Sequence, residues 1–190
     1  MSFWAVIPQL FTPARYLRIE HSAKKWLDWL VPLLIAIIEI AALKALPYEV
    51  PLFGEKGLIS IFTGLLQILV GFYIAALAAV ATFDREGMDL PMQGEPFVLR
   101  ERHNGPVTPV PLTRRRFLSM MFGYLAFLSF GLYFLGAGAE LLAENFRAII
   151  PSAWQWLTRD VFIFSYLFST SNLLVTTLLG LHYLSDRIHR

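Results

Sequence analysis

The sequence predicts an all-α membrane protein in which four transmembrane helices form a bundle, with a small β-hairpin between the second and the third. Three of the helices are predicted by stretches without Asp, Glu, Lys or Arg. They comprise 27 residues between Lys56 and Asp84, 23 between Arg116 and Glu140, and 25 between Asp160 and Asp186. About 20 apolar residues cross the hydrocarbon core of a bilayer, so each stretch is long enough. The fourth helix, over residues 26–46, has three ionisable residues and is otherwise apolar.

The whole chain, residues 1–190, is predicted to form a single four-span domain. Residues 1–25 are aromatic and then basic, which is typical of a segment that lies at a membrane surface. The predicted spans are residues 26–46, 58–83, 117–139 and 161–184, and residues 84–116 form the one long polar segment. Trp26 and Trp29 suit an interfacial aromatic belt, and Pro32 is expected to kink the first span.

The basic residues predict the orientation of these spans. Residues 1–25, residues 84–116 and the C-terminal tail hold twelve Lys and Arg, whereas the rest of the chain holds four. Cytoplasmic loops of membrane proteins carry the excess of Lys and Arg. We therefore expect a bacterial-type inner (plasma) membrane protein with both termini and residues 84–116 in the cytoplasm. The net charge of +2 does not favour direct binding of nucleic acid, and the lack of cysteine excludes thiol chemistry.

The hairpin is predicted by Asn104-Gly105 between two short apolar runs, the strongest local signal for such a turn. A two-residue loop pairs Arg102 with Val107 and, further out, Phe97 with Leu112. Pro106 favours a longer loop as the alternative. The register places Phe97, Leu99, Val110 and Leu112 on one face, and Arg100 and Arg102 on the other. An apolar face must be covered, so we expect these six residues to dock on residues 84–96, on another copy of the chain, or on a soluble cytoplasmic partner.

Glu39 is the most prominent polar residue within a span. An ionisable group there costs at least ~2.5–3.5 kcal/mol, so it is expected to face the protein interior and to have a partner. One interpretation is a proton or cation site, and the other is a structural acceptor for Gln67, Ser169 or Asn172. In the last span, Ser165, Ser169, Asn172 and Thr176 share one helical face. This stripe either lines a wet pore or forms hydrogen bonds across a dry bundle.

Small residues predict close helix packing and association with other copies. Gly71, Ala75 and Ala79 recur every four residues in the second span, and Ser119 and Gly123 make one such step in the third. We expect a homo-oligomer with these two spans at its interface. Arg114, Arg115 and Arg116 are predicted to anchor the chain to anionic lipid of the bilayer.

The sequence has no nucleophile paired with a base, no paired catalytic carboxylates and no two-histidine zinc motif, so an enzyme is not expected. His182, Asp186 and His189 have a helical spacing that metal proteins use, but they lie beside Arg187 and Arg190, so neither a metal site nor a cofactor is expected. The first hypothesis is a membrane anchor, sensor or scaffold whose polar segment recruits itself or a soluble protein. The second is a small channel, pore or transporter that uses Glu39 and the stripe in the last span. About 190 residues with four spans and a cytoplasmic loop resembles the layout of small membrane subunits in bacterial defence systems of the Kiwa type. This resemblance implies a membrane subunit of an anti-phage system.

Overall fold

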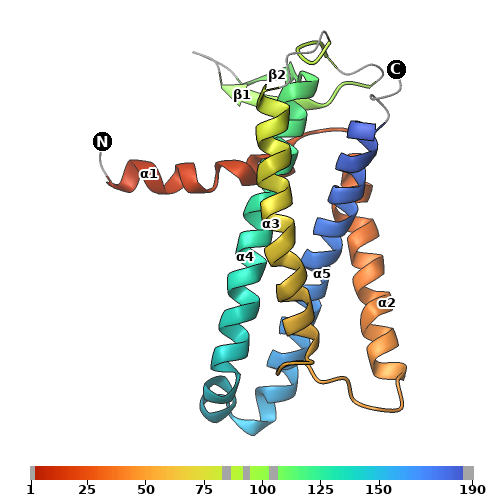
Figure 1. Ribbon diagram of the computed structural model, residues 1–190, viewed down its shortest axis with the longest axis vertical. Coiled ribbons are helices and arrows are strands. Elements are labelled where there is room, and N and C mark those ends of the chain that lie inside the picture. Colours follow the sequence, from red (N-terminus) through yellow and green to blue (C-terminus); the bar gives the residue numbers. More distant parts are fainter. Residues whose placement is uncertain (1–2, 83–86, 92–94, 103–106, 186–190) are drawn as a thin grey trace.

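The computed structural model describes residues 3–82, 87–91, 95–102 and 107–185 (Figure 1). The chain begins with helix α1 (Phe3–Leu10) and the 3₁₀ helix η1 (Thr12–Arg18), and a π-helical turn η2 (Trp26–Leu30) leads directly into α2 (Val31–Ala45). The remaining elements are α3 (Leu58–Thr82), the strands β1 (Val98–Arg102) and β2 (Val107–Pro111), α4 (Arg114–Ile149) and α5 (Ser152–Ser185). The protein is therefore mostly helical, with an antiparallel hairpin between the second and third long helices, as the sequence predicts.

In the part of the chain that the structure describes, four helical segments are long and apolar enough to cross a membrane: Trp26–Ala45, Leu58–Thr82, Arg114–Ile149 and Ser152–Leu184. The first two agree with the predicted spans, whereas the last two are longer. Residues 140–149 continue α4 and residues 152–160 begin α5, so the stretch before Pro151 is helical, as its sequence predicts. Only Ile150 and Pro151 separate these helices, because a helix usually ends at or before the residue preceding a proline.

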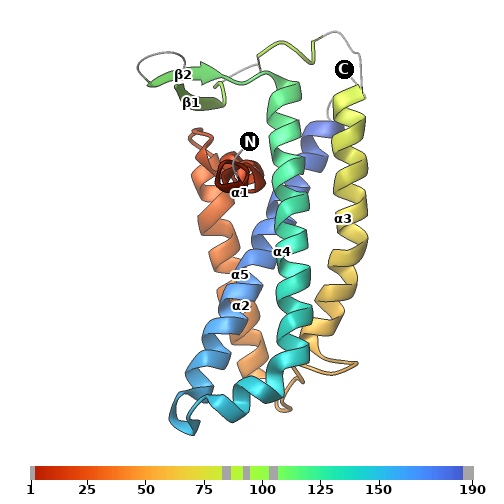
Figure 2. The same ribbon diagram turned by 90° about the vertical axis from the view of Figure 1, so that its left-hand side faces the viewer.

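The long helices pack in the spatial order α3, α4, α5, α2 (Figure 2). Helix α3 lies along α4 and buries Ile59, Leu66, Tyr73 and Val80, which are seven residues apart. This spacing is the heptad repeat that keeps one seam of a helix against its neighbour. Helix α5 crosses to pack on both α4 and α2.

Two glycines mark where the long helices approach most closely. A Cβ atom at Gly136 of α4 would lie 2.8 Å from Tyr166 Oη of α5 and 2.9 Å from Thr63 Oγ1 of α3. A Cβ atom at Gly180 would lie 2.8 Å from the terminal methyl of Met121. Side chains of α3 and α5 therefore meet at Gly136 of α4, and a larger residue there would require Tyr166 and Thr63 to shift.

The hairpin has the predicted register, with Leu99 opposite Val110 and Arg102 opposite Val107. The expected outer pair is also present, because the Leu112 amide donates to the Phe97 carbonyl at 2.8 Å. Residues 103–106, including the turn and Pro106, lie outside the described residues. Glu20 adds a short antiparallel bridge on the other side of β1, with N–O distances of 2.8 and 3.1 Å to Val98.

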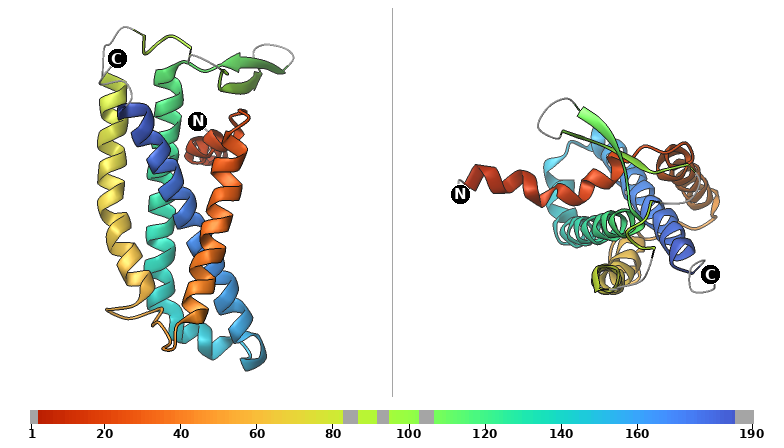
Figure 3. Two further views of the ribbon diagram at one scale, coloured as in Figure 1. Left: turned by 90° about the vertical axis from the view of Figure 1, so that its right-hand side faces the viewer. Right: turned by 90° about the horizontal axis from the view of Figure 1, so that it is seen from above.

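Helix α1 lies across the bundle axis, nearly perpendicular to the long helices (Figures 1 and 3). The chain after it packs on α4, where the ring centroids of Phe11 and Phe127 are 5.9 Å apart. The hairpin lies beyond α1 at the same end of the bundle (Figure 2). This placement agrees with the prediction of a membrane-surface segment, because the hairpin lies on one side of α1 and the apolar helices lie on the other.

Candidate functional site

A buried ion pair joins Lys24, just before the π-helical turn η2, to Asp28 within it. Both side chains are almost fully buried, and Lys24 Nζ also lies 4.0 Å from the centre of the Tyr16 ring. Desolvating two charges costs several kcal/mol per ion, so such a pair persists only with compensating contacts. The Tyr16 ring supplies one such contact through its negative face.

Pro32 explains a second contact of this cluster. A proline has no N–H, so the carbonyl four residues earlier, that of Asp28, loses its donor within the helix. The side-chain amide of Asn172 in α5 donates to this carbonyl at 2.7 Å. The Tyr124 hydroxyl of α4 in turn donates to Asn172 Oδ1 at 2.7 Å. One asparagine therefore joins three helices at the irregular turn, where π-helical geometry replaces the regular ladder.

Three polar atoms of this region are buried and have no hydrogen-bond partner among the described residues: Tyr16 Oη, Asp28 Oδ1 and Thr176 Oγ1. Burial raises the pKa of Tyr16 well above its usual range, and the charge of Asp28 adds to this effect. Burial also lowers the pKa of Lys24, although Asp28 opposes the change. We call this group the buried cluster; it comprises Tyr16, Lys24, Asp28, Tyr124 and Asn172. It joins the helices, and Asp28 Oδ1 remains able to accept a proton or a hydrogen bond.

Glu39 lies in α2, half-buried, and accepts a hydrogen bond from Ser171 Oγ at 3.2 Å. Among the described residues, none of its three expected partners, Gln67, Ser169 and Asn172, forms a hydrogen bond with Glu39. Gln67 is exposed on α3, Ser169 donates to the Ser165 carbonyl, and Asn172 binds Asp28. Glu39 borders a groove of about 250 Å³ that is otherwise apolar and is lined by residues 42, 43, 46, 58, 62 and 167.

The predicted polar stripe of α5 is divided among different environments. Ser165 is exposed, Ser169 is partly buried, and Asn172 and Thr176 are buried. Hydroxyls next to the stripe form hydrogen bonds within the protein: Thr170 with the Tyr166 carbonyl at 3.0 Å, and Thr177 with the Tyr73 hydroxyl at 2.5 Å. The contact between Thr177 and Tyr73 joins α5 to α3, as the dry-bundle interpretation predicts, whereas the Thr170 bond stays within α5.

The apolar face of the hairpin is covered by the chain itself. Phe97, Leu99 and Leu112 are at most 4% exposed, and Val110 is partly buried. The Phe97 ring lies 4.1 Å from His21 and 4.3 Å from Phe117, between centroids. Arg100 points away from this face and pairs with Glu20 at 2.9 Å, whereas the Arg102 side chain lies outside the described residues. The covering residues belong to residues 16–21, α4 and α5, a source that the sequence did not indicate.

The three consecutive arginines contact protein groups. Buried Arg114 donates to the Gly87 carbonyl at 3.4 Å, and Arg116 pairs with Glu101. Arg115 pairs with Asp89 at 2.9 Å and donates to the carbonyls of Val80 and Ala81, at 3.3 and 3.4 Å. Cations stabilise the C-terminal end of a helix, so Arg115 caps α3. The arginines thus attach the polar segment to the bundle.

The small residues of α3 face outward in the single chain. Gly71 and Ala75 are exposed, and Ala79, Ser119 and Gly123 are partly buried. A Cβ atom at Gly71 or Gly123 would meet no atom within 4 Å. Gly71 and Gly123 therefore have open space beside them in the single chain.

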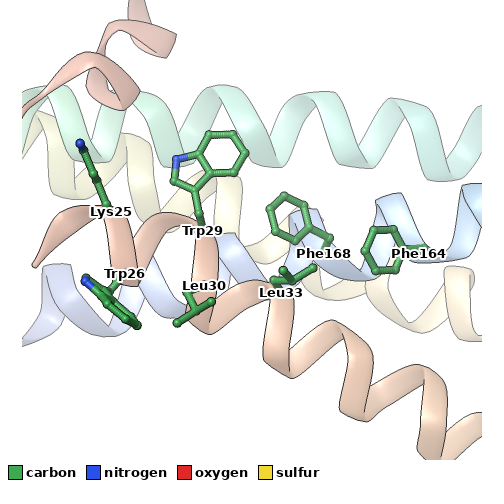
Figure 4. Close-up of a pocket in the computed structure, with 7 residues that line it drawn as sticks. All are labelled: Lys25, Trp26, Trp29, Leu30, Leu33, Phe164 and Phe168. Atoms are coloured by element: carbon green, nitrogen blue, oxygen red, sulfur yellow. The ribbon is translucent and has the colours of Figure 1, made fainter.

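A second, larger groove of about 420 Å³ lies between the start of α2 and α5 (Figure 4). Its lining residues are Lys25, Trp26, Trp29, Leu30, Leu33, Phe164 and Phe168. Lys25 is the one charged residue among them, and it lies at one end of the row.

Sequence reasoning missed the Lys24–Asp28 cluster, although two signals were present. Lys24 and Asp28 have the i, i+4 spacing of a helical ion pair. Pro32 follows Asp28 by four residues and therefore frees its carbonyl. What the sequence did not show is that Tyr16 and Tyr124 would close over the pair.

No protein-family model, curated protein or solved structure has a significant match to this chain. Its function is therefore argued from its own residues.

Proposed function

We propose that the chain is a non-enzymatic, multi-pass protein of a bacterial-type inner membrane that acts as an anchor, sensor or scaffold. Both termini and residues 84–116 face the cytoplasm, as the distribution of Lys and Arg favours. Copies of the chain associate with one another, and the polar segment docks a soluble protein partner. This proposal involves no cofactor and no direct contact with nucleic acid.

The observation that carries the proposal is the way the polar segment is built onto the end of the bundle. Its apolar face joins the main core, and its charged residues are held by protein groups, among them Glu101, which pairs with Arg116 and Arg15. These contacts hold the described part of the segment against the bundle, where it presents a preformed surface. Such a surface is what a scaffold needs in order to bind with little loss of conformational entropy.

The exposed side of the hairpin limits how a partner can dock. Strand β1 has β2 on one side and Glu20 on the other, and the outer edge of β2 contains Pro109 and Pro111. Prolines have no N–H to offer an added strand, so β-strand addition along β2 is blocked. A partner therefore recognises exposed side chains such as Val107 and Thr108.

The test changes these side chains without disturbing the core. Deletion of residues 97–112 would remove buried Phe97, Leu99 and Leu112, so the double substitution Val107→Glu/Thr108→Arg is sharper. Tyr48→Glu, at a position that is 84% exposed in the link on the far side of α3, is the matched control. Cross-linking in cells, followed by purification and mass spectrometry, should recover a soluble protein with the parent and the control but not with the double variant. Recovery of the same protein with all three would contradict the docking surface. A co-encoded soluble nuclease or nucleic-acid-binding protein would favour the scaffold and would be the first partner to examine.

The alternative function is a channel or transporter, and the contact between Glu39 and Ser171 beside a groove favours it. Under this alternative Glu39→Gln should abolish proton- or cation-dependent flux into liposomes, and Gln67→Ala serves as control. Flux that is absent in the parent, or unchanged by Glu39→Gln, would contradict it. Hydrogen bonds along α5 support the scaffold more than a pore.

A further inference from the structure

The groove between the start of α2 and α5 has the size and lining of a site for an amphipathic molecule. Its volume of about 420 Å³ falls within the range of ligand sites in proteins. Two walls form it: Trp26, Trp29, Leu30 and Leu33 on one side, and Phe164 and Phe168 on the other (Figure 4).

The chemistry of the groove changes along its length. Lys25 lies at one end, and the aromatic rings continue the row toward the other end (Figure 4). Trp29 stacks on Phe168 with 6.1 Å between centroids, and Phe168 lies 6.4 Å from Phe164. A cation at one end and an apolar wall beyond it match a molecule with an anionic head and a hydrocarbon tail.

The two neighbouring lysines are in opposite situations. Lys24 is buried and its charge is balanced by Asp28. Lys25 is exposed, and no acidic residue in the described part of the chain pairs with it. Lys25 is therefore available to pair with an anion outside the protein.

The depth of the groove identifies where that anion comes from. Lys25 precedes a helical segment of 20 residues, which is about the thickness of the hydrocarbon core. Trp26, which is 63% exposed, begins this segment as interfacial tryptophans do. Lys25 thus lies at head-group level, and Leu33, Phe164 and Phe168 lie at the level of the acyl chains.

We propose that this groove binds a phospholipid with an anionic head group. Its phosphate pairs with Lys25 Nζ, and one acyl chain lies along Trp29, Phe168 and Phe164. Basic residues between transmembrane helices recognise lipid head groups in this way. The inference rests on the proposed insertion into a membrane, but not on which side is cytoplasmic or on any protein partner.

The test uses the full chain in liposomes with Trp4, Trp154 and Trp156 changed to Phe, which leaves Trp26 and Trp29 as fluorophores. Phosphatidylglycerol and phosphatidylcholine, each with brominated acyl chains, serve as quenchers. We expect phosphatidylglycerol to associate about five-fold more strongly than phosphatidylcholine, the contribution of one basic residue near an anionic surface. Lys25→Gln should bring this ratio close to one while quenching by phosphatidylcholine is retained.

Arg18→Gln is the matched control, because it removes the same charge from the same segment outside the groove. It should leave the ratio unchanged, and an equal loss with both variants would overturn the site in favour of general surface charge. Equal quenching by both lipids in the parent would also overturn it.

A second reporter, with Trp154 and Trp156 retained and Trp4, Trp26 and Trp29 replaced, separates the remaining outcomes. Quenching of this reporter without quenching of Trp26 and Trp29 would show that a second copy of the chain covers the groove, which refutes lipid binding there. No quenching of either reporter would refute membrane insertion and this site together.

Discussion

The Tyr16 side chain stabilises the buried cluster through its ring and destabilises it through its hydroxyl. Its ring contacts Lys24 Nζ and stacks on Tyr124 with 5.0 Å between centroids, but its hydroxyl has no partner among the described residues. An unsatisfied buried hydroxyl costs about 1–3 kcal/mol, whereas the ring contacts do not need it. The useful part of Tyr16 is therefore its aromatic ring.

We predict that Tyr16→Phe leaves the free energy of unfolding unchanged or raises it by about 1 kcal/mol at pH 7. The substitution should also reduce the loss of stability at alkaline pH. The raised pKa of Tyr16 means that the unfolded phenol ionises first, so its contribution to stability is present below pH 10.0 and is lost above it. The variant should lose less stability than the parent between pH 10 and 11.

Lys24 acts in the opposite direction, because its lowered pKa makes stability rise toward pH 10.5, but it does so in both proteins. Thermal unfolding in detergent at several pH values measures both effects, and a loss above 1 kcal/mol at pH 7 would contradict the role given to the ring.

At the scale of elements, the irregular start of α2 and the middle of α5 form one unit. Pro32 removes a donor, and Asn172 replaces it from another helix. The π-helical turn is therefore stable only when α5 lies beside it.

This dependence predicts coupling between Pro32 and Asn172. Asn172→Leu leaves the Asp28 carbonyl and the Tyr124 hydroxyl without partners and should cost about 2–4 kcal/mol. In a Pro32→Ala background the residue at 32 has an N–H for the Asp28 carbonyl, so the same change should cost about 1 kcal/mol less. Ser169→Ala removes only a hydrogen bond to its own helix and should cost little in either background. Equal costs of Asn172→Leu in both backgrounds, from thermal unfolding, would refute the compensation.

The same elements show how far sequence reasoning reaches. The pairing of Leu99 with Val110 was predictable because the turn residues and the two-residue period of strands define a register locally. The cover of the hairpin was not, because Glu20 and His21 come from a segment more than 70 residues away and carry no strand pattern. The buried cluster was missed for the same reason: its i, i+4 pair is local, but Tyr124 and Asn172 are brought in by the tertiary fold.

At the scale of the whole molecule, the two ends of the bundle differ, and this difference predicts an orientation across the membrane. The hairpin, residues 16–21 and Arg114–Arg116 gather at one end, and the link 46–57 lies at the other (Figures 1 and 2). Lys44 and Asp160 pair at 3.2 Å near that second end. The mainly apolar segment of η2 and α2 thus has a lysine at each end, Lys25 before it and Lys44 in its last turn.

The lack of cysteine makes this orientation directly testable, because an introduced cysteine is the single thiol of the chain. In right-side-out spheroplasts, a membrane-impermeant maleimide should label Tyr48→Cys, whereas Val107→Cys should be labelled only after permeabilisation. Both side chains are exposed, so burial does not account for a difference. Leu66→Cys, buried within α3, is the negative control and should resist labelling in both conditions. Labelling of both exposed positions from one side would show that α3 does not cross the membrane, and the reverse pattern would place the hairpin outside the cytoplasm.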